Sequence, residues 1–163
     1  MFSEKELEEY AEVLIWGLQT ARRRKFKKND VVAIPYHLPA RKLAEILYDR
    51  LLRMRLNPVP RALVTPQMEK SLYVRATPRQ LKFVPAGDEV MNQHLNGSIH
   101  LYAPESITHL SDVDPKKIGQ AAVARKYLRD ILTQREEQGL FSWTLGVFPT
   151  MALARHAKMS LKA

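Results

Sequence analysis

The stretch Val31-Val32-Ala33-Ile34-Pro35-Tyr36 decides the fold. It is a short, continuous apolar run that follows the turn residues Asn29-Asp30. Such a run is typical of a β-strand buried on both faces, as in a parallel sheet. Parallel strands are usually connected by helices, so the segments on either side of this run should have the helical period.

The preceding segment predicts a helix over residues 4–24. Ser3 and Glu6 have the spacing of a capping box, in which each side chain satisfies a backbone N–H at the helix start. Apolar residues then recur at the helical period from Leu7 to Leu18. The segment after the strand predicts a second helix, because Pro39 can open it without losing a hydrogen bond and Pro58 ends it.

The same alternation continues to the end of the chain. We expect strands within 59–64, 98–103 and 140–147, one or two short helices within 66–94, a long helix from 115 to near 139, and a last helix over 149–158. Thr65, Thr77 and Asp114 each precede a proline, which is the pattern of an N-cap followed by a first-turn proline. Helices between strands imply right-handed crossovers. The sequence predicts a single α/β domain over residues 1–163, with a parallel sheet of about four strands in the order 2-1-3-4 and helices on both faces.

Composition restricts the class of protein. Of the 163 residues 45% are hydrophobic and 26% are charged, as in a globular domain. The absence of cysteine excludes disulfides, a thiolate nucleophile and cysteine-based metal sites. No apolar run approaches the roughly 18 residues of a membrane span. The opening residues are acidic, so we expect neither a signal nor a transit peptide, and a cytoplasmic location.

The net charge of +9 is unevenly distributed. Residues 21–82 carry 16 basic and four acidic groups, whereas residues 83–113 carry four acidic groups and no Lys or Arg. The most conspicuous basic run comprises Arg22, Arg23, Arg24, Lys25, Lys27 and Lys28. One interpretation is a solvated helix end that complements the helix dipole. The other is an anion- or RNA-binding module that uses the basic stretch 22–82.

Motifs for catalysis and cofactors are missing. No glycine lies between Gly17 and Gly87, so no glycine-rich loop can bring its backbone N–H groups to a phosphate after the first strand. There is no His-Glu-x-x-His motif and no Gly-x-Ser-x-Gly elbow. His94, His100 and His109 surround the third expected strand near Glu105, and they either converge on a ligand or are ordinary polar residues. Tyr73 and Phe83 alternate with basic residues, as in a base-stacking surface or an amphipathic helix.

One segment has a distinctive pattern. Ser142-Trp143-Thr144-Leu145-Gly146-Val147-Phe148-Pro149-Thr150 leads into a helical stretch, 152–161, that contains Met159-Ser160. It resembles the thermophilic-type metallo-aminopeptidases (the aminopeptidase T and aminopeptidase S group), in which a strand ends in a Trp…(Tyr/Phe)-Pro-Thr element before a helix. Residues 10–14, 30–34, 99–104, 113–117 and 121–135 also resemble that family, so the resemblance covers nearly the whole chain.

The resemblance implies an N-terminal α/β domain without the metal-binding C-terminal domain. In this family that second domain holds two divalent metal ions (Zn, Co or Mn) with Glu, His and Asp ligands, and none of those ligands matches a position here. We therefore expect a non-catalytic domain of a hydrolase that removes N-terminal amino acids from peptides, inactive alone and without a cofactor. Its partners would be its own catalytic domain and a second copy, with neither a membrane nor nucleic acid involved. Trp143, Phe148 and Met151 are the candidates to face the other domain or the substrate cavity.

Overall fold

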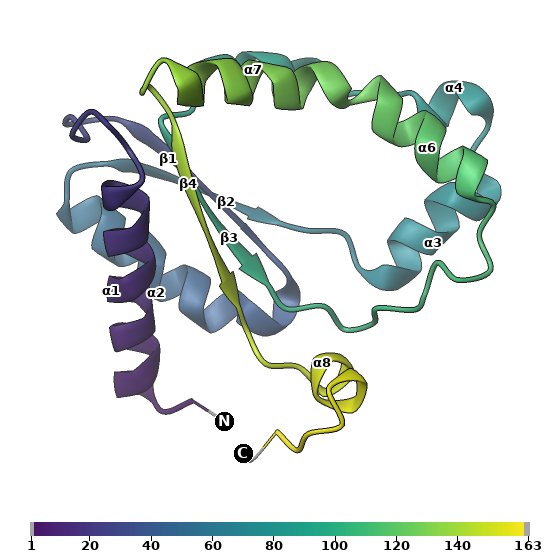
Figure 1. The fold of residues 1–163 in the computed structure, drawn as a ribbon, viewed down its shortest axis with the longest axis horizontal. Coiled ribbons are helices and arrows are strands. Elements are labelled where there is room, and N and C mark those ends of the chain that lie inside the picture. The colour runs from purple at the N-terminus through teal and green to yellow at the C-terminus, as the bar shows by residue number, and fades with distance from the viewer. Residues whose placement is uncertain (1, 162–163) are drawn as a thin grey trace.

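The computed structural model describes residues 2–161 and contains one four-stranded parallel sheet (Figure 1). Its strands are β1 (Val31–Tyr36), β2 (Asn57–Ala62), β3 (Gly97–Tyr102) and β4 (Ser142–Val147). They lie in the order β2-β1-β3-β4, and every pair is parallel. The predicted fold class and strand order are confirmed.

Helices connect the strands, but two details differ from the expectation: residues 66–94 form three helices rather than one or two, and Pro58 lies within β2 rather than at the end of the preceding helix. They are α1 (Glu4–Thr20), the 3-10 helix η1 (Leu38–Ala40), α2 (Arg41–Arg53), α3 (Pro66–Arg75), α4 (Pro78–Leu81), α5 (Ala86–His94), α6 (Pro115–Ala124), α7 (Lys126–Glu137) and α8 (Met151–His156). The capping box of Ser3 and Glu6 is present, and Thr65, Thr77 and Asp114 cap α3, α4 and α6 with their side chains.

Tertiary contacts shorten two of the predicted helices. Helix α1 ends at Thr20 rather than at residue 24, because the Arg22 side chain turns into the interior and pairs with Asp30. The long helix predicted from 115 to 139 is divided into α6 and α7 at Arg125. Helix α6 packs against α4 whereas α7 packs against α5, so the two halves of the predicted helix pack against different helices.

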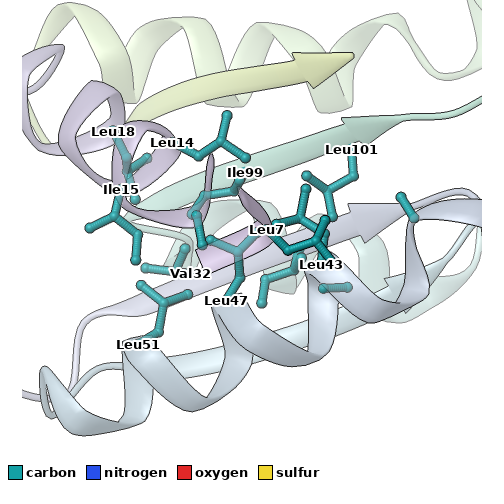
Figure 2. Packing of buried hydrophobic residues seen from close by; sticks show 14 of the residues in the cluster. Leu7, Leu14, Ile15, Leu18, Val32, Leu43, Leu47, Leu51, Ile99 and Leu101 are labelled. Atoms are coloured by element: carbon teal, nitrogen blue, oxygen red, sulfur yellow. The ribbon is translucent and has the colours of Figure 1, made fainter. Parts of the chain in front are cut away.

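The main core lies between the sheet and helices α1 and α2 (Figure 2). Val32 of β1 points into this layer, as do Leu43 and Leu47 of α2 (Figure 2). These three residues and Ile34 of the same cluster are completely buried. Each such side chain contributes on the order of 1.5–3 kcal/mol through removal of its surface from water. This layer fixes the positions of β3 and β4, whose opposite face carries exposed apolar side chains.

The opposite face of the sheet is covered only in part. Val31 and Ala33 alternate with the core residues of β1, so they point to this second face. There they contact Met91 of α5 and Leu132 of α7, together with Phe141 before β4. Helices therefore lie on both faces as predicted, but on the second face they contact the region where the strands begin. Figure 1 shows α7 at that end of the sheet.

Candidate functional site

The outer face of β3 and β4 is an exposed apolar surface. Trp143, Leu145 and Val147 alternate along β4 and retain 50%, 49% and 52% of their surface, and Tyr102 at the end of β3 retains 40%. Together they form a set that we call the open face: Tyr102, Trp143, Leu145 and Val147. A contiguous group of large exposed apolar side chains in a globular protein marks a contact surface.

The open face arises because α1 lies very close to the other side of β4. The residues of β4 that point toward α1 are small, and the Ser142 hydroxyl donates a 2.8 Å hydrogen bond to the Leu18 carbonyl. A Cβ on Gly146 would lie 2.9 Å from the Tyr10 hydroxyl and 3.0 Å from Leu14 Cδ2. Large side chains have no room under α1, so all the large apolar residues of β4 point away from it.

The two edge strands of the sheet differ in composition. Strand β2 at the other edge contains Pro58, Pro60 and Arg61, which discourage pairing with a further strand. Strand β4 contains neither proline nor a charged residue. The β4 side of the sheet therefore combines an edge without these residues, where the Tyr10 hydroxyl donates to the Val147 carbonyl, with a half-exposed apolar face. The apolar face is suited to contact with another polypeptide.

The three candidate residues from the sequence occupy different environments. Trp143 belongs to the open face, and Met151 at the start of α8 is 53% exposed. Phe148 instead is half-buried against the main core, with its ring centroid 5.5 Å from that of Phe2. Leu145, Val147 and Tyr102 were not among the candidates, although the alternation of small and large residues in Ser142–Val147 is visible in the sequence.

The carboxyl end of β1, where parallel sheets usually bind ligands, is occupied by a structural histidine. Nδ1 of His37 lies 3.3 Å from both the Ala103 nitrogen and the Leu101 carbonyl oxygen. The His37 ring also meets the Tyr102 ring edge-on, with centroids 5.5 Å apart. His37 thus fastens the end of β1 to the end of β3.

The histidines near the third strand do not converge. His109 Nε2 lies 2.8 Å from the Glu69 carboxylate, while His94 Nδ1 contacts the Val90 carbonyl of its own helix at 2.8 Å. His100 is on the outer face of β3, opposite Leu145 in the register, and partial burial lowers its pKa. Within residues 2–161, no three or more His, Asp or Glu side chains lie where they could hold a metal ion.

The basic run 22–28 is divided into residues with different roles. Arg22 is buried, donates from Nη1 to the Asp30 carboxylate at 2.8 Å and lies 4.4 Å above the Phe26 ring centroid. Arg23 and Arg24 are exposed and pass next to Gly139. Lys25, Lys27 and Lys28 line a surface cavity. Only part of the run is therefore available to an external anion.

The base-stacking interpretation of 73–83 does not gain support from the geometry. Tyr73 is only 9% exposed and packs with Leu81 and Ala121 in a small cluster between α3, α4 and α6. Phe83 is 64% exposed and lines a shallow cavity with Tyr127. Burial of Tyr73 leaves no continuous row of aromatic rings on which bases could stack.

The chain is similar to known proteins in sequence and in fold. The model of the thermophilic metalloprotease family (M29) matches residues 3–163. Among solved structures, wild-type AmpT from Thermus thermophilus is similar, with a TM-score of 0.69 and 16% identity over 93% of this chain. The alignment covers 38% of AmpT, so the chain spans well under half of that protein. No curated protein matches the chain. No helix in the described residues is long and apolar enough to cross a membrane.

Proposed function

The chain belongs to the thermophilic metalloprotease family, and from this premise we propose that it is the N-terminal, non-catalytic domain of a metal-dependent aminopeptidase. Such an enzyme removes N-terminal amino acids from peptides. In this proposal the domain packs against a metal-binding catalytic domain, bounds the substrate cavity and contributes to a homodimer.

The polar residues support a non-catalytic role. A centre with two metal ions needs several carboxylate and imidazole ligands within a few ångströms of one another. The described residues contain no such group, and His109 and Glu69 form a pair without a third ligand. The residues present do not fit the metal ions of the family, so we assign no catalytic step to this chain.

The open face is the observation that carries the proposal. Trp143, Leu145 and Val147 each leave about half of their surface in water, whereas Ile34, Ile99 and Leu101 on the other face are buried beneath α1 and α2. Interfaces between domains bury just such groups of aromatic and aliphatic side chains, which tolerate water exposure poorly. We assign the open face to contact with the catalytic domain.

The direction of the chain is compatible with this assignment. After β4 the chain enters α8, where the Thr150 hydroxyl donates a 2.7 Å hydrogen bond to the Pro104 carbonyl that follows β3. This contact holds α8 at the carboxyl end of β3 and β4, the end at which Tyr102 and Val147 lie. A domain connected at this end would lie next to the open face.

The test is an activity assay with metals. Chain 1–163 is incubated with leucine p-nitroanilide and Co²⁺, Zn²⁺ or Mn²⁺, and release of nitroaniline is followed by absorbance. We expect no turnover, and the intact mass of the natural protein should exceed that of this chain. Stoichiometric metal uptake together with turnover by 1–163 would contradict the proposal.

A further inference from the structure

A basic pocket lies at the amino-terminal end of the sheet, away from the open face. It forms where the end of α1, the loop before β1 and the loop before β2 meet, and its volume is about 620 Å³. That volume is within the range of small-molecule sites. Among the residues that line it are Lys25, Phe26, Lys27, Lys28, Arg55 and Leu56.

The four cations of this pocket lack ion-pair partners. Lys25, Lys27, Lys28 and Arg55 line it, and no acidic residue does. Basic residues nearby are paired: Arg22 with Asp30, Arg50 with Glu8 and Glu12, and Arg53 with Asp49. In the part of the chain that the structure describes, these four cations have no carboxylate partner, and their place around one pocket sets them apart from the other unpaired basic residues, Arg23 and Arg24, beside it.

Helix dipoles do not account for so much charge. Helices α1 and α2 both end beside the pocket, at Thr20 and Arg53. The carboxyl end of a helix is equivalent to roughly half a negative charge. Two such ends offset about one positive charge, so the pocket keeps a net charge of about +3. This excess favours an anion with more than one negative charge.

The loops that carry the lysines are held in place. The Asn29 N–H donates to the Arg55 carbonyl at 2.8 Å, and the Asn57 side chain donates to the Asn29 carbonyl at 2.9 Å. The Asp30 carboxylate accepts the Lys27 backbone N–H at 2.9 Å. A pocket whose backbone is already ordered loses little entropy when a ligand binds.

Arg55 occupies a backbone conformation that normally calls for glycine. Its φ is +60°, and it closes α2 in a Schellman motif: its N–H donates to the Leu52 carbonyl at 2.8 Å and that of Leu56 to the Leu51 carbonyl at 3.0 Å. Glycine is the usual residue here because it has no Cβ. Strained positions of this kind concentrate at binding sites, where the side chain has a use. Here the strained residue is one of the four cations of the pocket.

We propose that this pocket binds a compact polyanion with adjacent phosphoryl groups, either an inorganic polyphosphate or the phosphates of a nucleotide. Lysine ammonium groups act as point charges suited to phosphate, and closely spaced phosphoryl groups match several cations around one cavity. The site uses side chains, in contrast with the glycine-rich backbone loops that the sequence lacks. Binding of a polyanion at this pocket goes beyond the proposed function and does not depend on it.

The experiment titrates chain 1–163 with sodium triphosphate and with ATP by calorimetry at low and moderate salt. We expect 1:1 binding that weakens as salt rises, because the contacts are largely electrostatic. Lys27→Glu/Lys28→Glu should weaken binding at least tenfold. Arg55→Gly should weaken it several-fold while the melting temperature stays the same or rises, since the strain is relieved. Tighter binding of ATP than of triphosphate would assign the site to nucleotides, and equal binding to polyphosphate.

The matched control is Arg79→Glu/Lys82→Glu, which makes the same change in charge at exposed Arg79 of α4 and at exposed Lys82, the residue that follows this helix. It should leave triphosphate binding within twofold of the original. Equal losses in the two double variants would contradict the proposal, because they would indicate only general attraction to a basic protein. No binding at low salt would also contradict it, as would a strong preference for single-stranded RNA over triphosphate, because that requires an extended surface.

Discussion

On the face of the sheet beneath α1 and α2, Ile34 and Leu101 retain at most 1% of their surface. On the opposite face Leu145 and Val147 retain about half. The side chains are of the same kind and belong to the same sheet, so their chemistry does not explain the difference. The first face has its covering layer within the chain, whereas around β4 the second face has none among the described residues. A sheet needs a covering layer on each apolar face, and we propose that the catalytic domain supplies the second layer here.

The largest effect should come from shortening one leucine on each face. Leu101→Ala removes a buried side chain and should lower the free energy of unfolding by about 3 kcal/mol, because it leaves a cavity. Leu145→Ala on the next strand should cost less than about 1 kcal/mol in the isolated chain. Urea unfolding of both variants measures the difference. Equal losses would mean that the two faces are packed alike.

A second variant tests why the large residues of β4 point outward. Gly146→Ala would place a Cβ 2.9 Å from the Tyr10 hydroxyl and 3.0 Å from Leu14. Forcing α1 away should cost about 1–3 kcal/mol, as in other overpacked cores. Thermal or urea unfolding measures it.

Gly119→Ala is its control, because a Cβ at that position on α6 meets nothing within 4 Å. Alanine is the better helix former, so this change should be neutral or stabilising by up to about 1 kcal/mol. If Gly146→Ala behaves like the control, α1 does not exclude large side chains from that side of β4.

The smallest effect concerns His100, which lies opposite Leu145 on the outer face. Partial burial lowers its pKa below the ordinary 6.5. The folded chain therefore binds this proton less tightly than the unfolded chain. Its contribution to stability is complete above pH 6.5 and declines as the pH falls through the lower folded value.

An NMR titration of the His100 ring checks this directly. The midpoint in the original chain should lie below 6.5. Leu145→Ala should move it back toward 6.5, because water gains access to the imidazole. Val123→Ala, at a 75% exposed position on α6, should leave it unchanged. An unchanged midpoint in Leu145→Ala would show that Leu145 does not shield His100.

Local signals in the sequence account for most of the fold. The apolar run 31–36, the capping box at Ser3 and the N-caps that precede prolines depend on neighbouring residues only, so they predicted β1 and the starts of α1, α3, α4 and α6. The strand order was predicted from the alternation of strands and helices instead. The end of α1 could not be predicted in this way, because it depends on the pairing of Arg22 with Asp30.

The candidate surface was predicted only in part for a similar reason. The segment 140–147 was interpreted as a strand, and Trp143 was identified from the family resemblance. Which side of β4 stays open depends on α1, whose Tyr10 hydroxyl donates a 3.1 Å hydrogen bond to the Val147 carbonyl. These two residues are 137 positions apart in the sequence. No local sequence pattern indicates a contact between residues so far apart in the chain. The basic pocket likewise joins residues 25–28 to Arg55 through the fold.

The most direct test of the central claim uses the absence of cysteine from this chain. Leu145→Cys introduces one thiol on the open face, and its labelling by a maleimide is compared in chain 1–163 and in the natural protein. Val123→Cys, on an exposed position of α6, serves as the reference. We predict at least tenfold slower labelling at position 145 in the natural protein, with no change at 123. Equal rates at position 145 would contradict the claim that a partner covers the open face.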